Sequence, residues 1–333
     1  MKNILLLTIS ITIALIAVEV WMALYNPIPY RKPPELIPSD AWRELLHRRS
    51  SILGLSYELA PNKEKYSHGT NIKTNSHGMR DNEFLGGSNE SVCNILVLGD
   101  SYTFGFGVEG NETYANVLES LFTDYSTNKV VQVLNLGVGG YSSKDEALVL
   151  KSKGMKWNPA LIIVGYVLND PEIEAIQPLH RYYQDVKWWQ YFNIFRLIAS
   201  AKNEYDVKTL GGGNYIRYLH NTDSEKWKSV QAAFSDIEET AVGRDIPVLL
   251  VIFPLMKGVE WSDYLYGDLH SQVAREGKES GFNTIDMTEV YTMHSQELLM
   301  VAPDDAHPNM LGHKLAAETI YQIINEYNLL DCK

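Results

Sequence analysis

The chain is poor in cysteine. Its 333 residues include only Cys93 and Cys332, too few for a disulfide scaffold, and neither lies in a CxxC or Cys/His cluster with metal-ligand spacing. The nine histidines include no HExxH motif, and the spacing of His307 and His313 does not suit a helical metal site. We therefore predict no metal and no cofactor, with Cys93 packed in the interior and Cys332 in a tail.

Basic residues are also scarce relative to acidic ones. The 29 lysines and arginines face 41 aspartates and glutamates, a formal net charge of -12. A chain with this charge has no broad attraction for phosphate backbones, which disfavours nucleic acid as a partner. The hydrophobic content of 45% is that of a globular protein and excludes disorder throughout. The length permits one large α/β domain with an extension, or two modest domains.

One long apolar run departs from this ordinary composition. It extends from Ile4 to Leu24, and Glu19 is its only charged residue. About 20 apolar residues suffice to span a bilayer, and no AxA-like cleavage site follows. We interpret residues 1–25 as a membrane anchor or uncleaved signal. Basic residues on both sides leave its orientation open, and we place the body outside the cytoplasm because a single N-terminal apolar segment directs export.

The next segment, residues 26–90, is predicted to be a linker and N-terminal extension. Its first part, PIPYRKPPELIP, is typical of a stiff polar spacer. Thr70 to Phe84 alternates loosely and carries turn residues, which indicates a short hairpin or edge element.

From residue 91 to 333 the pattern indicates a single domain with a parallel sheet covered by helices, because strand-length apolar runs alternate with amphipathic stretches. The near-continuous apolar runs expected for doubly buried strands are 93–99, 130–135, 160–168, 246–253 and 282–287. Helices are predicted at 113–123, 143–153, 225–242, 262–280 and 309–327.

An insertion at about 171–222 interrupts this alternation and is far longer than an ordinary connection. It is rich in aromatic residues at helix-compatible spacing, including Trp188 and Trp189, and a GGG break follows at Gly211 to Gly213. Two interpretations stay open. The aromatic residues form a lid or substrate wall, or they are the core of an extra helical layer.

A candidate nucleophile follows the first predicted strand. The sequence GDSYTFGFG places Ser101 at the carboxyl end of this buried strand and just before a helix, where open α/β sheets build their sites. Glycine allows the tight turn, and backbone N–H groups at a helix start can face developing negative charge. A lone GDS can occur by chance, so the case for a nucleophile depends on the position of the motif at the end of a buried strand.

A candidate base lies near the other end of the chain. A serine hydroxyl needs a neighbouring base to take its proton, and a third group to orient that base. The sequence PDDAHPN supplies His307, with Asp304 three residues before it on a loop that enters the last helix. We expect Asp304 to reach Nδ1 of His307, which leaves Nε2 for Ser101. A lone DxxH would more often be a capping aspartate on a surface loop.

Two further turns offer donors for a tetrahedral oxyanion. NLGVGGYSS follows the second strand, where a glycine lets a backbone N–H approach a substrate oxygen. LND follows the third strand, where the Asn169 amide can donate. Each turn alone is ordinary, but serine, glycine, asparagine and histidine fall in order at successive strand ends.

These four segments, GDSYTFG, NLGVGG, VLND and DDAH, resemble the four blocks of the GDSL/SGNH hydrolase family across about 94–313. The resemblance implies a flavodoxin-like three-layer α/β/α sandwich with a parallel sheet, and metal-free ester hydrolysis. It implies Ser101 as nucleophile, Asp304 and His307 as the rest of the triad, and an oxyanion hole from Ser101, Gly140 and Asn169. Gly140 is chosen because the family's glycine lies five residues after the asparagine that ends the second strand. Val167 departs from the family's GxND block.

The leading functional hypothesis is a membrane-anchored serine esterase that hydrolyses a short acyl ester, such as acetate, on a glycan or lipid. The alternatives are a membrane-tethered O-acyltransferase acting on cell-envelope polysaccharide, because a sugar hydroxyl can resolve the same acyl-enzyme, and a non-catalytic glycan-binding protein on the same fold. The sequence leaves the acyl group and the oligomeric state open.

Overall fold

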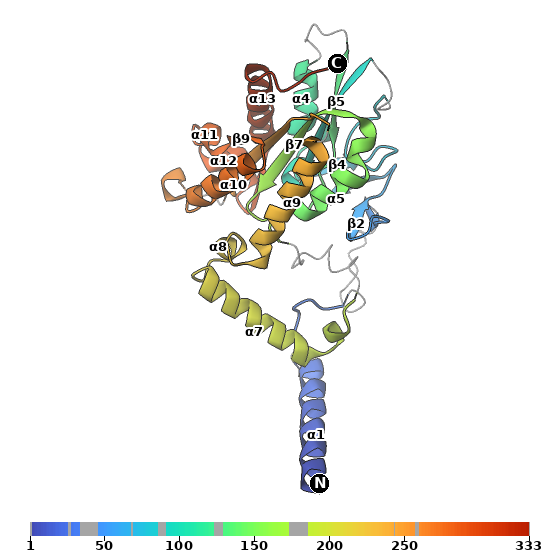
Figure 1. Cartoon of the computed structure of the whole chain (residues 1–333), viewed down its shortest axis with the longest axis vertical. Helices are drawn as coiled ribbons and strands as arrows, with labels where there is room; N and C mark the ends of the chain where they lie inside the picture. Colours follow the sequence, from blue (N-terminus) through green and yellow to red (C-terminus); the bar gives the residue numbers. More distant parts are fainter. Residues whose placement is uncertain are drawn as a thin grey trace. The chain divides into compact units, whose positions relative to one another are not determined.

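A computed structural model describes residues 2–25, 28–33, 46–67, 69–85, 91–122, 129–172, 186–242, 244–256 and 260–332 (Figure 1). The chain divides into two compact units. One comprises Met1–Asp40 and Glu174–Tyr218, and the other comprises Ala41–Ile173 and Leu219–Lys333. The larger unit contains the central sheet, and the smaller one contains the apolar N-terminal helix.

Five parallel strands form the central sheet. They are β5 (Val92–Gly99), β6 (Val130–Asn135), β7 (Pro159–Val167), β8 (Val248–Phe253) and β9 (Asn283–Asp286). Their order in the sheet is β6-β5-β7-β8-β9. This is the flavodoxin-like order 2-1-3-4-5, with the reversal between β5 and its neighbours. The predicted parallel α/β sheet is confirmed by the parallel pairing of every neighbouring pair of strands, and the apolar runs of β5, β6, β7 and β8 are largely buried.

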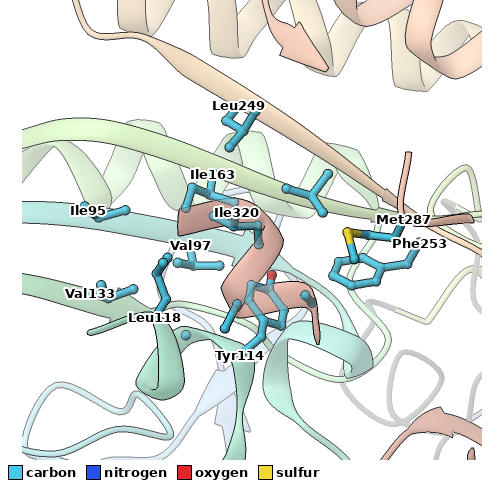
Figure 2. Close-up of a cluster of buried hydrophobic side chains, with 14 of the residues drawn as sticks. Ile95, Val97, Tyr114, Leu118, Val133, Ile163, Leu249, Phe253, Met287 and Ile320 are labelled. Carbon is cyan, nitrogen blue, oxygen red and sulfur yellow. The ribbon is translucent and has the colours of Figure 1, made fainter. Parts of the chain in front are cut away.

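Helices cover both faces of the sheet. α4 (Tyr114–Phe122) and α13 (Met310–Glu326) pack on the face that carries Ile95, Ile163 and Leu249 (Figure 2). α5 (Ser143–Ser152), α9 (Glu225–Val242) and α10 (Gly267–Glu279) cover the opposite face. Each fully buried side chain of this core contributes about 1.5–3 kcal/mol of hydrophobic stabilisation. The sheet therefore provides a rigid base for the loops at its carboxyl edge.

Short elements complete the described part of the chain. The hairpins are β1 (His47–Arg49) with β2 (Tyr57–Leu59), β3 (Glu64–Ser67) with β4 (Thr70–Lys73), and β10 (Met300–Ala302) with β11 (Asp305–Pro308). The short helices are α3 (Ser101–Phe104), α8 (Tyr215–Leu219), α11 (Thr288–Tyr291), α12 (Gln296–Leu299), η2 (Gly110–Glu112), η3 (Gly154–Trp157), η4 (Trp188–Tyr191) and η5 (Trp261–Asp263). The hairpin expected within 70–84 thus uses only Thr70–Lys73, and its other strand precedes it.

The part of the N-terminal extension around Tyr57 packs against the loop that follows β6 through buried tyrosines. The Tyr57 hydroxyl donates to the Gly139 carbonyl oxygen at 2.8 Å, and the Tyr141 hydroxyl donates to the Tyr57 carbonyl oxygen at 2.8 Å. Tyr57 is fully buried. A buried hydroxyl needs such a partner, so these bonds fix the position of the extension beside the loop that follows β6. Residues 46–85 are therefore part of the larger unit.

The smaller unit contains two long helices. α1 (Lys2–Tyr25) is long and apolar enough to cross a membrane, a property that a signal sequence shares. Its large side chains are exposed, including Ile13 and Leu24. α7 (Asn193–Leu210) belongs to the insertion, and its start is hydrogen-bonded to α1. Of the two interpretations left open for the insertion aromatics, the core role does not fit Trp188, Phe192 and Phe195, which are exposed.

Cys93 is buried as expected, but the sequence analysis did not predict that it forms a disulfide with Cys332. Cys93 lies in β5, and Cys332 lies beyond the end of α13. The Cα atoms are 5.4 Å apart although 239 positions separate them in the chain. The sequence could not predict this pairing because two distant cysteines meet only when α13 packs along the sheet.

We predict that the double substitution Cys93→Ser with Cys332→Ser lowers the free energy of unfolding by about 2–4 kcal/mol, because the open chain gains conformational entropy when unfolded. Urea unfolding of the full chain in detergent, followed by circular dichroism, measures this change. Dithiothreitol should lower the wild-type midpoint toward that of the variant and leave the variant unchanged. Equal midpoints without reductant would contradict the prediction.

Candidate active site

The turn after β5 presents Ser101 at the carboxyl edge of the sheet. Gly99 has φ of 156°, and a Cβ there would lie 2.0 Å from the Thr103 Oγ1, so only glycine fits. Asp100 is the N-cap of α3, and its Oδ1 accepts a hydrogen bond from the Tyr102 N–H at 2.9 Å. Gly105 ends this one-turn helix in the left-handed region. Ser101 is consequently the first helical residue, held by a capped and sterically fixed turn.

His307 is brought to Ser101 by the β10–β11 hairpin. Its Nε2 is 2.9 Å from the Ser101 Oγ, and the imidazole is 29% exposed. The Tyr102 hydroxyl donates to the Ala306 carbonyl oxygen at 2.9 Å, which ties the hairpin to the helix that carries the serine. A hydroxyl and an imidazole at this distance can exchange a proton directly. The predicted pairing of Ser101 with His307 is present in the structure.

The carboxylate that contacts the histidine is Asp305, and the prediction of Asp304 is wrong in this respect. The Asp305 Oδ1 is 2.5 Å from the His307 Nδ1 and also accepts the His307 backbone N–H at 3.2 Å. Asp304 is exposed. The reason is local: β11 begins at Asp305, and side chains two positions apart in a strand point to the same side. The prediction assumed a curled loop, in which a spacing of three would suit.

Asn169 lies just beyond the end of β7, and its side chain is held by Asp100. The Asn169 Nδ2 donates to the Asp100 Oδ2 at 2.9 Å, and the Ser101 Oγ is 3.3 Å from the same oxygen. Burial raises the pKa of the Asp100 carboxyl above its usual range. Asp100 therefore links the predicted nucleophile to the predicted amide donor, a role that the GDS motif alone did not indicate.

Val167, which departs from the family's third block, is fully buried at the end of β7. Its side chain belongs to the main hydrophobic cluster, and its N–H donates to the Asp170 Oδ2 at 3.0 Å. A side chain at this position is therefore accommodated by the core, while Asn169 two residues later keeps its place beside Asp100.

The glycine-rich loop after β6 runs along the Ser101 turn. The Val138 N–H donates to the Gly99 carbonyl oxygen at 3.1 Å. A Cβ on Gly137 would lie 2.5 Å from the Phe104 N, so the loop can approach only because this residue is glycine. Gly140 follows with φ of 81°. The loop thus lies where an oxyanion donor is needed, and the choice of Gly140 as that donor stays a prediction.

Arg80 and Asp81 support both loops, and sequence reasoning missed them. Arg80 is 1% exposed and donates from its guanidinium to the carbonyl oxygens of Phe104, Gly105 and Val108. Burial lowers the pKa of Arg80 to about 10, so it stays charged near neutral pH. The Asp81 Oδ2 accepts the Asn135 N–H at 3.0 Å, and burial raises the pKa of Asp81 to about 7. The sequence feature that could have pointed to these two residues is that Arg80 and Asp81 are adjacent within a polar segment.

The polar groups at this site are a hydroxyl, an imidazole, carboxylates and an amide. Within the described ranges, no group of three or more histidine, cysteine, aspartate or glutamate side chains has the arrangement to hold a metal ion.

A sequence profile of the GDSL-like lipase/acylhydrolase family matches residues 97–315, which is more than half of the chain. The protein belongs to this family and is a GDSL-type ester hydrolase. The matched region contains Ser101, Asn169, Asp305 and His307, the residues whose geometry is described above. A comparison with curated proteins found no match.

Solved structures with a similar fold include several esterases. A two-domain esterase active on acetylated mannans is 17% identical, with 71% of this chain and 49% of that chain covered and a TM-score of 0.44. This chain therefore spans about half the length of that enzyme. An acetyl xylan esterase is 14% identical, with 69% and 99% covered and a TM-score of 0.44. A G-D-S-L family protein from Desulfitobacterium hafniense is 16% identical, with 69% and 98% covered and a TM-score of 0.42.

We predict that Asp305→Asn lowers kcat for an activated ester about 10²- to 10⁴-fold, because an amide no longer holds the histidine in the required tautomer. The neighbouring Asp304→Asn is the matched control and should change kcat less than about twofold, since an exposed carboxylate outside the site contributes little. Steady-state hydrolysis of p-nitrophenyl acetate measures both. A larger loss in the Asp304 variant would restore the original assignment.

Proposed function

We propose that this GDSL-type enzyme works through an acyl-enzyme on Ser101, with His307 as general base and Asp305 as its orienting group. The observation that supports this most directly is the continuous series of short contacts from the Ser101 Oγ to the His307 Nε2, and from the His307 Nδ1 to the Asp305 Oδ1. Serine is weak as a nucleophile without a base, and this arrangement supplies one.

The proposed reaction has two halves. The Ser101 Oγ attacks the ester carbonyl carbon while its proton moves to the His307 Nε2, and collapse of the tetrahedral intermediate expels the alcohol, which takes that proton. Water then attacks the acyl-enzyme, His307 accepts its proton, and the released carboxylic acid leaves as the proton returns to the Ser101 Oγ. Asp305 stabilises the imidazolium that forms in each half without taking its proton.

The negative charge on the tetrahedral oxygen needs donors that are fixed before the reaction begins. We propose the backbone N–H groups of Ser101 and Gly140 and the side-chain amide of Asn169 for this role. The contact of Asn169 with Asp100 uses one hydrogen of its Nδ2, and an amide nitrogen carries two. Asp100 would then orient the amide while the second hydrogen meets the oxyanion.

The proposed substrate is a short acyl ester, such as an acetate, on a glycan or lipid. Phe106 restricts the space beside the nucleophile, since its ring centroid lies 5.3 Å from that of His307. The same ring packs on Gly139, where a Cβ would lie 2.5 Å from it. Filled space on this side of the catalytic residues favours a small acyl group over a long chain.

We also propose that α1 anchors the protein in a membrane with the catalytic unit outside the cytoplasm. The exposed apolar surface of α1 requires a nonpolar environment. The Cys93–Cys332 disulfide supports the external location, because disulfides persist in oxidising compartments and are rare in the cytosol.

For Asn169→Ala we predict a fall in kcat of about 10²- to 10³-fold with little change in KM, because an oxyanion donor acts mainly in the transition state. Steady-state kinetics on p-nitrophenyl acetate separate the two parameters. A loss confined to KM would instead assign Asn169 to substrate binding.

For Ser101→Ala we predict complete loss of ester turnover with an unchanged circular dichroism spectrum, because the hydroxyl begins the covalent path and its removal is sterically mild. A fluorophosphonate probe should label the wild type once, at Ser101, and should not label this variant. Labelling at another serine would move the active site.

A second measurement distinguishes hydrolysis from acyl transfer. Acetate release and acetyl-sugar formation are followed in one reaction containing an activated acetyl ester and an oligosaccharide acceptor. Hydrolysis predicts acetate as the main product. If the oligosaccharide clears the acyl-enzyme much faster than water does, the protein is an O-acyltransferase.

A further inference from the structure

The smaller unit contains a hydrogen-bonded contact between the apolar helix and the insertion. Glu19, the only charged residue between Ile4 and Leu24, accepts the Asn193 N–H at 2.6 Å and the Ile194 N–H at 2.9 Å. Its Oε1 also accepts from the Asn193 Nδ2 at 2.9 Å. α7 therefore begins at a carboxylate supplied by α1, near the end of α1 that lies away from the N-terminus (Figure 1).

Through this contact Glu19 caps the N-terminus of α7. The first N–H groups of a helix have no partner within the helix, and the N-cap residue of α7, Phe192, has no side-chain acceptor for them. Glu19 provides the acceptor, and its charge is favourable at the positive end of the helix dipole. The same bonds satisfy a carboxylate that would otherwise be costly in an apolar segment.

Around the start of α7 the polar side chains point inward and the apolar side chains point outward. Asn193 and Arg196 are 4% and 2% exposed, and Arg196 interacts electrostatically with Glu19. Trp188, Phe192 and Phe195 are exposed, and their rings contact one another at centroid distances of 5.1 to 6.3 Å. Ile198, one turn later, is 58% exposed. A protein surface that faces water has the reverse arrangement.

The aromatic residues of α1 indicate what lies against this surface. Trp21 and Tyr25, in the last turns of α1, are exposed and contact each other. Trp and Tyr gather where a membrane-spanning helix meets the lipid headgroups. Glu19 lies within one turn of Trp21, so the start of α7 is held at the same level. Farther along α7 the character changes, because Lys202 and Asp206 form an exposed ion pair.

We propose that Trp188, Phe192, Phe195 and Ile198, here called the aromatic stripe, lie in the headgroup region of the bilayer that α1 spans. The partner is the lipid surface itself. Glu19 fixes the stripe at this depth by capping α7, and the insertion is a second membrane contact in addition to the anchor. This inference rests on the proposed anchoring by α1.

Spin labels test the depth of the stripe in the full chain. The described residues include no free cysteine, so a new cysteine gives a specific thiol. Phe195→Cys and Ile198→Cys report on the stripe, Ile13→Cys reports on the middle of α1, and Ser235→Cys on the exposed face of α9 is the water reference. Each variant is labelled with a nitroxide and reconstituted in phosphatidylcholine and phosphatidylglycerol vesicles.

The readout is the ratio of collision rates with oxygen, which concentrates in lipid, and with a water-soluble nickel complex. We expect the stripe labels to give ratios several-fold above that of Ser235→Cys and below that of Ile13→Cys. A ratio equal to the water reference overturns the proposal. Shielding from both reagents also overturns it, because a second copy or another protein would then cover the stripe.

The same measurements distinguish an error in the proposed anchoring by α1 from an error in the proposed position of the aromatic stripe. A water-like ratio at Ile13 overturns both, whereas a lipid-like ratio at Ile13 with a water-like ratio at Phe195 overturns the stripe alone. Ester hydrolysis by the same vesicles tests the catalytic proposal independently, because no labelled position belongs to the site.

Substitutions of Glu19 test its capping role. Glu19→Leu makes α1 more apolar but removes the acceptor, so the ratio at Ile198→Cys should fall toward the water reference, and trypsin should cleave the insertion roughly fivefold faster. Glu19→Gln keeps a carbonyl acceptor and should retain most of the wild-type ratio. If Glu19→Leu leaves both measurements unchanged, Glu19 does not hold the stripe.

Discussion

The contact between Ser101 and His307 depends on the rest of the larger unit, which must hold the two side chains together. The two residues are 206 positions apart, and the proposed proton transfer requires their side chains to stay within hydrogen-bond distance. The parallel sheet satisfies half of this demand by fixing the end of β5. The β10–β11 hairpin satisfies the other half, because the bond from the Tyr102 hydroxyl to the Ala306 carbonyl oxygen fastens it to the helix that carries the serine.

Buried charges hold the loops around this contact. Asp100 caps α3 and orients the Asn169 amide, and Arg80 binds three carbonyl oxygens of the segment that follows Ser101. Buried ionised groups are costly unless they are hydrogen-bonded, so each of these side chains is strongly committed to one geometry. Their burial gives the site rigidity, which is the property that a preorganised oxyanion site requires.

The smaller unit follows a different physical rule. Around the start of α7, Asn193 and Arg196 are buried whereas Trp188, Phe192 and Phe195 are exposed, an arrangement that suits a lipid environment better than water. Glu19 connects this arrangement to α1, because its carboxylate accepts the N–H groups at the start of α7, a helix far away in the sequence. The sequence left the insertion aromatics open as a lid or as core, and the exposure of Trp188, Phe192 and Phe195 supports contact with lipid as a further interpretation.

The sequence by itself determined the strands and the main helices, and it indicated Ser101 as the proposed nucleophile. The apolar runs of β5, β7 and β8 are buried, and GDS follows directly on the first of them, so the positions of Ser101 and His307 could be predicted from local pattern and family resemblance. The boundaries of β5, β6 and β7 differ from the prediction by one residue or less.

Tertiary structure decided what depends on contacts between distant segments. The β10–β11 hairpin selects Asp305 over Asp304 locally, but the contact of that hairpin with Ser101 joins segments 206 positions apart. The same is true of three other contacts, namely the Cys93–Cys332 bond, the support from Arg80 and the capping of α7 by Glu19. In each of them, the sequence around one residue gives no sign of its partner. Sequence periodicity reports which face of an element is buried, but it carries no information on which other element covers that face.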